Sequence, residues 1–154
     1  MPSQNDPIII GSDHAGYALK TFIKAELEKR GISCKDVGAH KLDPEDDYPD
    51  FACLVADAVA KKEFTRGIAI CGAGIGTSIV ANRYPGVRAA LCVTAEMACL
   101  SRAHNNANVL VLGQRITPFQ SAAEILAVWL ETGFEGGRHE RRVDKIDRCG
   151  AGGR

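Results

Sequence analysis

Residues 67–78 read Gly67-Ile68-Ala69-Ile70-Cys71-Gly72-Ala73-Gly74-Ile75-Gly76-Thr77-Ser78, and this stretch decides the fold. An apolar run ends at a cysteine and is followed by glycines at alternating positions, which is typical of a buried strand that leads into a tight turn. A segment with helical character follows, as far as about Arg83. The bare N–H groups of such a turn and the positive end of the helix dipole both favour an anion. Cys71 therefore lies where a thiolate would be stabilised.

Strands and helices alternate on both sides of this stretch. Further strands are expected at residues 7–10, 32–37, 87–93 and 109–113, and helices at 17–30, 51–62, 95–104, 119–131 and 138–147. The strand at 32–37 is the most polar, which indicates a place near the sheet edge. Thr94 is expected to cap the helix after it, and Thr117 with Pro118 to be cap and first residue of the 119–131 helix.

This alternation predicts an α/β fold, with three α/β/α layers and a Rossmann-like, five-stranded parallel sheet. We expect a single domain over residues 1–154, with flexible ends at 1–6 and 148–154. Ligands of such sheets bind beyond the carboxyl ends of the strands. The carboxyl rim of this sheet would hold Asp13, His14, Cys71 and Arg115.

The composition limits the classes of function. The 154 residues carry 19 basic and 19 acidic side chains, so the overall charge does not favour nucleic-acid binding. No apolar run approaches the roughly 20 residues of a membrane span, and residues 1–7 lack a signal-peptide core. The six cysteines form no C-x-x-C pair, and we read them as reduced thiols of a cytoplasmic protein.

Several polar residues permit more than one interpretation. Asp13 and His14 fit a sugar and anion site, or equally a helix cap beside an exposed histidine. His104 fits a proton shuttle, although a lone surface histidine is commoner. On a helix, Arg138, Arg141 and Arg142 would share one face that suits a phosphate, or simply a solvated basic surface.

The glycine turn also admits a nucleotide-binding module. It lacks the third glycine of the dinucleotide fingerprint, because Thr77 occupies that position, yet Glu96 lies at a suitable distance for a ribose contact. The four histidines show no spacing typical of metal ligands, so we expect neither a metal nor another cofactor.

The assembled motifs resemble those of the ribose/galactose isomerase family. The resemblance spans about residues 8–147 and rests on Gly11-Ser12-Asp13-His14-Ala15-Gly16, Asp47-Tyr48-Pro49, Cys71-Gly72-Ala73-Gly74-Ile75-Gly76, Ser101-Arg102-Ala103-His104-Asn105 and Glu135-Gly136-Gly137-Arg138-His139. It implies a metal-free aldose–ketose isomerase of carbohydrate metabolism that interconverts ribose 5-phosphate and ribulose 5-phosphate through an enediolate.

The same resemblance implies roles for individual residues. Cys71 would be the base, since Thr77 stands where members without the cysteine carry a glutamate. His104 would open the sugar ring, with Asp13 beside a sugar hydroxyl. The oxyanion would be held by the backbone of Gly72, Ala73, Gly74, Ile75 and Gly76, the sugar by Tyr48 and Asn105, and the phosphate by His14, Arg115, Arg138 and Arg142.

Sites of this family are shared between two subunits, so the resemblance implies a homodimer as the minimum unit and leaves a tetramer open. A partner chain would then supply the basic segment at Arg138, which lies far along the chain from Cys71. Ala73 departs from the family, whose members often carry Ser or Thr there. An isomerase of a four- or six-carbon sugar phosphate and a non-catalytic sugar-phosphate sensor therefore remain alternatives.

Overall fold

The protein folds around a five-stranded parallel sheet, described over residues 3–150 by a computed structural model. The sheet order is β2-β1-β3-β5-β4, and every pairing is parallel. The strands are β1 (Ile8–Ser12), β2 (Cys34–Asp36), β3 (Arg66–Cys71), β4 (Ala89–Leu91) and β5 (Val109–Gly113). The α/β class, the parallel sheet and the Rossmann-like arrangement predicted from the sequence are confirmed.

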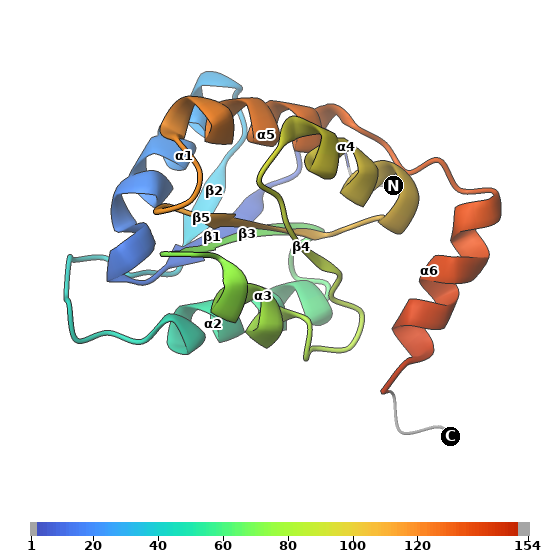
Figure 1. The fold of residues 1–154 in the computed structure, drawn as a ribbon, viewed down its shortest axis with the longest axis horizontal. Helices are drawn as coiled ribbons and strands as arrows, with labels where there is room; N and C mark the ends of the chain where they lie inside the picture. Colours follow the sequence, from blue (N-terminus) through green and yellow to red (C-terminus); the bar gives the residue numbers. More distant parts are fainter. Residues whose placement is uncertain (1–2, 151–154) are drawn as a thin grey trace.

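Helices cover both faces of the sheet (Figure 1). They are α1 (Tyr17–Lys29), α2 (Tyr48–Ala60), α3 (Ile75–Ala81), α4 (Ala95–Asn105), α5 (Phe119–Glu131) and α6 (Arg138–Arg148), and a short 3-10 turn at His14–Gly16 precedes α1. Helices α1, α4 and α5 lie on one face, and α2 and α3 on the other. Helix α6 projects from one end of the molecule and packs mainly against α4.

The side-chain alternation of the strands creates two cores. Ile8, Ile10 and Ile70 belong to the cluster with α1, α4 and α5, whereas Ile9 and Ala69 belong to the cluster with α2 and α3. Strands buried on both faces need apolar residues at every position, because neighbouring side chains point to opposite faces. The uninterrupted apolar runs in the sequence therefore mark the central strands β1, β3 and β5.

The edge strands are shorter than predicted. The expected strand 32–37 is reduced to β2 and 87–93 to β4, because each pairs with only one neighbour. The predicted edge position of β2 is confirmed. Strand β1 extends to Ser12, and α2 begins at Tyr48, earlier than expected, with Pro49 in its first turn.

Two helix caps were predicted, with different outcomes. Thr94 accepts a hydrogen bond from the N–H of Met97 at 3.1 Å and caps α4, as predicted. The prediction for Thr117 and Pro118 was wrong, because Pro118 is extended and α5 begins at Phe119. The Thr117 N–H bonds to the carbonyl of Gly113 at 2.9 Å, and the Thr117 hydroxyl is buried without a partner.

The two ends of the chain lie partly outside the described residues. Helix α6 includes Arg148, so the C-terminal tail begins later than predicted. The prediction of flexibility also covers residues 1–2 and 151–154, which the structure does not describe. Between residues 3 and 150, no helix combines the length and apolarity needed to cross a bilayer.

Candidate active site

A cavity of about 340 Å³ opens at the carboxyl ends of β1 and β3. Strand β1 has β2 on one side and β3 on the other, so the chain reverses its direction of winding at this point. Such reversal points are where ligands of open parallel sheets bind. The cavity is lined by Asp13, His14, Ala15, Tyr48, Cys71, Gly72, Ala73, Gly76 and Arg115, which confirms the predicted grouping on one rim.

Cys71 is the last residue of β3 and is only 5% exposed. The backbone N–H of Gly74 donates to its sulfur at 3.1 Å. Gly74 adopts a φ of +76°, and a Cβ there would come within 2.6 Å of the Leu91 side chain. Glycine at position 74 therefore allows the backbone to fold back over the thiol at the start of α3.

The turn after β5 supports this loop. The N–H groups of Gln114 and Arg115 donate to the carbonyls of Cys71 and Gly72 at 2.9 and 2.8 Å. A Cβ on Gly113 would lie 2.5 Å from the backbone carbon of Ala73, so the two turns are in close contact. Strand β5 thus places the Arg115 guanidinium beside the glycine turn.

Asp13 sits at the entrance to the 3-10 turn. Its carboxylate accepts the N–H of Gly16 at 3.1 Å, so the helix-cap interpretation is correct, and Asp13 also lines the cavity. Desolvation by burial raises the pKa of Asp13 above its ordinary value.

His14 is held by Asp46, a residue to which the sequence assigned no role. Oδ1 of Asp46 accepts both the backbone N–H of His14, at 2.9 Å, and a bond from its ring Nδ1, at 2.6 Å. The hydrogen bond to Asp46 raises the pKa of His14 above its ordinary value. His14 and Asp46 lie 32 positions apart, and no sequence pattern links them. The acidic run at 46–47 was the signal in the sequence that could have drawn attention to Asp46.

Tyr48 packs against the glycine turn from the start of α2. A Cβ on Gly76 would fall 2.4 Å from the Tyr48 ring, so glycine is required for this approach. Ala73 lacks a hydroxyl, and the neighbouring hydroxyls of Thr77 and Ser78 do not line the cavity. Ser78 donates to the carbonyl of Ile75 at 2.7 Å, and the Thr77 hydroxyl is buried without a partner.

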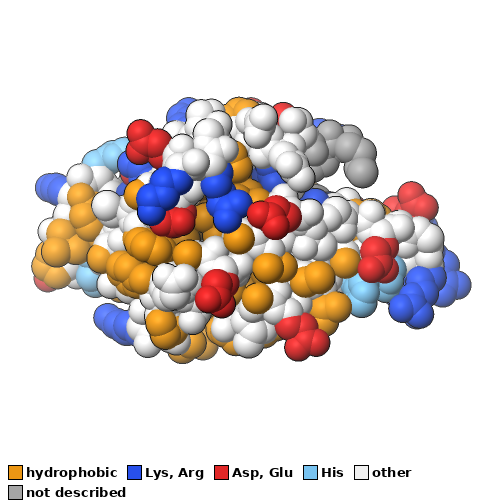
Figure 2. Space-filling model, turned by 90° about the horizontal axis from the view of Figure 1, so that it is seen from above, with side chains coloured by type: hydrophobic (Ala, Val, Ile, Leu, Met, Phe, Trp, Pro, Cys, Tyr) orange, Lys and Arg blue, Asp and Glu red, His pale blue; other side chains and the backbone are white. Residues whose placement is uncertain are grey.

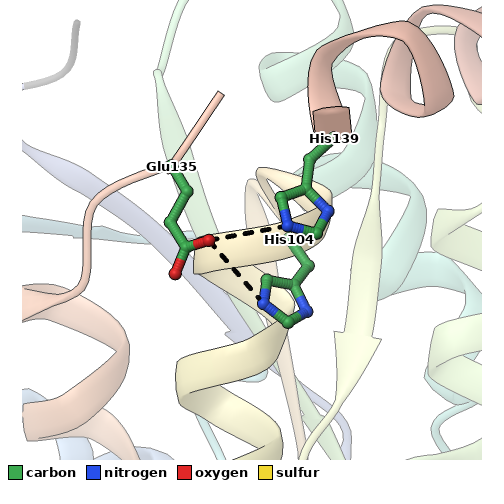
Figure 3. A group of neighbouring side chains, drawn as sticks. All are labelled: His104, Glu135 and His139. Carbon is green, nitrogen blue, oxygen red and sulfur yellow. Dashed lines mark ion pairs between the residues drawn. The ribbon is translucent and has the colours of Figure 1, made fainter. Parts of the chain in front are cut away.

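A second group of polar residues consists of His104 on α4, His139 on α6 and Glu135 between α5 and α6 (Figure 3). The two imidazole rings stack with centroids 4.2 Å apart. Oε2 of Glu135 lies 3.9 Å from Nε2 of His104 and 3.5 Å from Nε2 of His139. Desolvation, followed by the charges of His104 and Arg138, lowers the pKa of His139.

Within residues 3–150, two sets of three side chains present possible metal ligands within 4.8 Å of one another. One set is His104, Glu135 and His139, and the other is Asp13, His14 and Asp46. Each set combines residues from separate segments of the chain. The spacing of the histidines in the sequence therefore indicated neither set. In the second set, Nδ1 of His14 is already bonded to Asp46.

The predicted site residues fall into two groups at opposite ends of the sheet (Figure 1). His104 and Asn105 are in the last turn of α4, which starts beyond β4 and runs about 16 Å back toward the amino ends of the strands. Arg138 and Arg142 are exposed on α6. None of these four residues lines the Cys71 cavity. Figure 2 shows basic and histidine side chains together at the end formed by α6.

Comparison with known proteins supplies the family. A family model described as Ribose/Galactose Isomerase matches residues 8–146. The chain belongs to the ribose/galactose isomerase family.

Named members are similar over nearly their whole length. The chain is 46% identical to the probable ribose-5-phosphate isomerase B of Mycoplasma genitalium, over 92% of this chain and 93% of that protein. It is 45% identical to ribose-5-phosphate isomerase B of Escherichia coli strain K12, over 90% of this chain and 93% of that protein. Ribose-5-phosphate isomerase B of Clostridium thermocellum has a similar structure, with a TM-score of 0.89 at 50% identity, covering 92% of this chain and 95% of that one.

A solved structure of the Mycoplasma genitalium ribose-5-phosphate isomerase B contains bound ribulose-5-phosphate. It matches with a TM-score of 0.89 at 46% identity and covers 92% of this chain and 94% of that one. Membership of the ribose/galactose isomerase family confirms the expected class, a sugar-phosphate isomerase. Glu96, on which the nucleotide-binding alternative depended, is exposed on α4 and does not line the cavity.

Proposed function

We propose that the protein interconverts ribose 5-phosphate and ribulose 5-phosphate without a metal ion. The observation that carries the proposal is a nearly buried thiol, Cys71, which receives a backbone N–H and shares a cavity with His14 and Arg115. The cavity thus combines a base with two groups that suit a phosphate. The relatives that are named ribose-5-phosphate isomerase B support the five-carbon substrate.

Cys71 acts as the base in this mechanism. Its thiolate removes the proton from C2 of the open-chain aldose, and the C–H electron pair becomes the double bond of an enediolate. The carbonyl oxygen at C1 takes up the negative charge. A proton then passes from the C2 hydroxyl to the C1 oxygen, so that the negative charge moves to the oxygen at C2. Re-forming the carbonyl at C2 while Cys71 returns its proton to C1 gives the ketose and regenerates the thiolate.

The glycine turn stabilises the charge that develops on oxygen. The Gly74 N–H is engaged by the Cys71 sulfur, so the neighbouring N–H groups of residues 72–76 receive the oxyanion. Donors already held in position need no reorganisation during the reaction, and each can contribute roughly 3–4 kcal/mol. Tyr48, packed on Gly76, lies against the sugar.

The remaining groups come from a second copy of the chain. From this second copy, His104 opens the furanose ring and Asn105 contacts the sugar, with Asp13 of the first copy nearby. Arg138 and Arg142 of the second copy bind the phosphate. They act together with His14 and Arg115 of the first copy. A single chain holds the two groups of residues at opposite ends of its sheet. In a twofold dimer, each end of one chain can lie beside the opposite end of its partner.

Exposed apolar side chains support such a dimer. Helix α3 exposes Ile75 and Ile79, and helix α4 exposes Met97 and Leu100. Each pair has helical spacing on one face of its helix. Large apolar side chains that are exposed on two helices favour an interface with another protein.

An isomerase of a different sugar phosphate is the second candidate, because Ala73 carries no hydroxyl beside the reacting oxygens. Ser78 and Thr77 do not line the cavity and so do not replace it. The backbone alone then polarises the carbonyl, and the length of the preferred sugar depends on the residues around Tyr48.

The test is to incubate the protein with ribose 5-phosphate in the presence of EDTA and to follow ketose formation. We expect turnover with EDTA present, and the highest kcat/KM for the five-carbon member of a series of four-, five- and six-carbon aldose phosphates. Absence of activity on every aldose phosphate would refute the isomerase proposal. A higher kcat/KM for a four- or six-carbon member would favour the second candidate.

A further inference from the structure

The contact between Asp46 and His14 joins the acidic loop before α2 to the turn after β1. One carboxylate oxygen accepts two bonds from the same residue, one from its backbone at 2.9 Å and one from its ring at 2.6 Å. The two bonds restrict both the position of His14 and the rotation of its ring. Asp46 is thereby tied to a residue that lines the cavity, although Asp46 does not line the cavity itself.

The surroundings of the pair favour a charged histidine. The second oxygen of Asp46, Oδ2, is buried and has no hydrogen-bond partner in the described part of the chain. A carboxylate withdrawn from water is costly unless a cation compensates it. The imidazolium of His14 is the cation in contact, and its Nδ1–H must donate toward Asp46.

The other charged groups around His14 act in both directions. The negative charge of Asp13, on the same turn, raises the pKa of His14, as does Asp46, whereas Arg115 from the β5 turn and desolvation lower it. Cys71 and Tyr48 line the same cavity from β3 and α2. The hydrogen bond to Asp46 is the largest of these influences, and the net direction is upward.

We propose that Asp46 is a positioning residue, which holds the His14 ring in its cationic form with Nδ1 engaged and Nε2–H free for the phosphate dianion of the substrate. Nε2 makes no hydrogen bond within residues 3–150. The proposal rests on the proposed function in one respect only, namely that a phosphate ester occupies the His14 end of the cavity.

The sign of the pH dependence follows from the raised pKa. Below about pH 6.5, the ordinary value of histidine, the ring is charged with or without Asp46. Between that value and the raised pKa, the ring is charged only when the Asp46 side chain is beside it. At still higher pH the ring is neutral in either case. The benefit of Asp46 is therefore greatest in the middle range.

The test compares Asp46→Asn with the unmodified protein. The asparagine oxygen can still accept both bonds, but the charge is removed. Nuclear magnetic resonance titration of the His14 ring, assigned by loss of its signal in His14→Asn, should give a midpoint above 6.5 in the unmodified protein and a lower one in the variant. Asp47→Asn is the matched control, because Asp47 is exposed and caps α2 without a side-chain bond.

Steady-state kinetics with ribose 5-phosphate provide the second readout. The ratio of KM in Asp46→Asn to KM in the unmodified protein should reach about fivefold in the middle pH range, fall toward one on both sides, and be accompanied by little change in kcat. Substrate ionisation cancels in this ratio. On the His14→Asn background, Asp46→Asn should have no further effect on KM.

Three results would overturn the proposal: a His14 midpoint at or below 6.5, a midpoint that Asp46→Asn does not move, or a KM ratio that is the same at every pH, as a purely structural role requires. Binding of inorganic phosphate, followed by calorimetry over the same pH range, repeats the comparison without turnover. Failure of the isomerase assay alone would then count against the proposed function, while phosphate binding would still decide the role of Asp46.

Discussion

At the scale of single residues, the proposed mechanism depends most on the thiol of Cys71. Replacing Cys71 by Ala removes the base and leaves His14 and Arg115 in place. We expect kcat to fall by about 10²–10⁴-fold. Calorimetry with ribose 5-phosphate should show that the variant still binds. Cys53→Ala, on α2, is the control that removes a thiol outside the cavity. Unaltered turnover in Cys71→Ala would mean that another group is the base.

The arginines of α6 provide a matched pair of substitutions at the same scale. Arg142→Ala should raise KM and leave kcat almost unchanged, because a phosphate contact is present in both the ground state and the transition state. A lost bond between charged groups corresponds to a fall in kcat/KM of roughly 10- to 100-fold. Arg148→Ala, at the exposed last residue of the same helix, should have little effect. A fall in kcat at constant KM would argue against the phosphate role of Arg142.

At the scale of structural elements, the site depends on two turns in contact, one after β3 and one after β5. Gly113→Ala would place a Cβ 2.5 Å from the backbone of Ala73, where no flexible side chain can move aside. We expect about 1–3 kcal/mol of destabilisation in thermal or denaturant unfolding, together with a lower kcat. In the control, Gly133→Ala, a Cβ meets nothing within 4 Å. Equal stabilities of the two variants would show that the contact between the turns is loose.

At the scale of the whole molecule, the proposal that two subunits share each site predicts complementation between two inactive proteins. Cys71→Ala and His104→Asn each damage a different half of the site. In a mixed dimer, one of the two sites contains both substitutions and the other contains neither. Co-refolding equal amounts should restore about a quarter of the activity of the unmodified dimer, as expected for random pairing in a twofold dimer.

The mass of the assembly should be measured on the same samples by light scattering. A mixture that exchanges subunits but stays inactive would contradict sharing of His104. A protein that is monomeric and active would contradict the dimer itself.

Much of the fold was predictable because strand and helix periodicities are local properties. The apolar runs at β1, β3 and β5 and the helical spacing between them predicted the parallel sheet, and the sheet in turn predicted the carboxyl rim. Strand ends were less predictable, since β2 and β4 are shortened by their edge positions. The predicted cap of α5 was wrong because Thr117 belongs to the turn after β5. Its N–H donates to the carbonyl of Gly113, and its hydroxyl is buried.

The sequence by itself determined the α/β class, the order of the elements and the position of Cys71 before a glycine turn, because these follow from neighbours along the chain. Only the tertiary structure decided that Asp46 bonds to His14 across 32 residues. It also decided that His104 and Arg142 lie away from the cavity, at the far end of the sheet. Both depend on how distant segments pack, since helix α4 must return to the amino ends of the strands before β5 can begin.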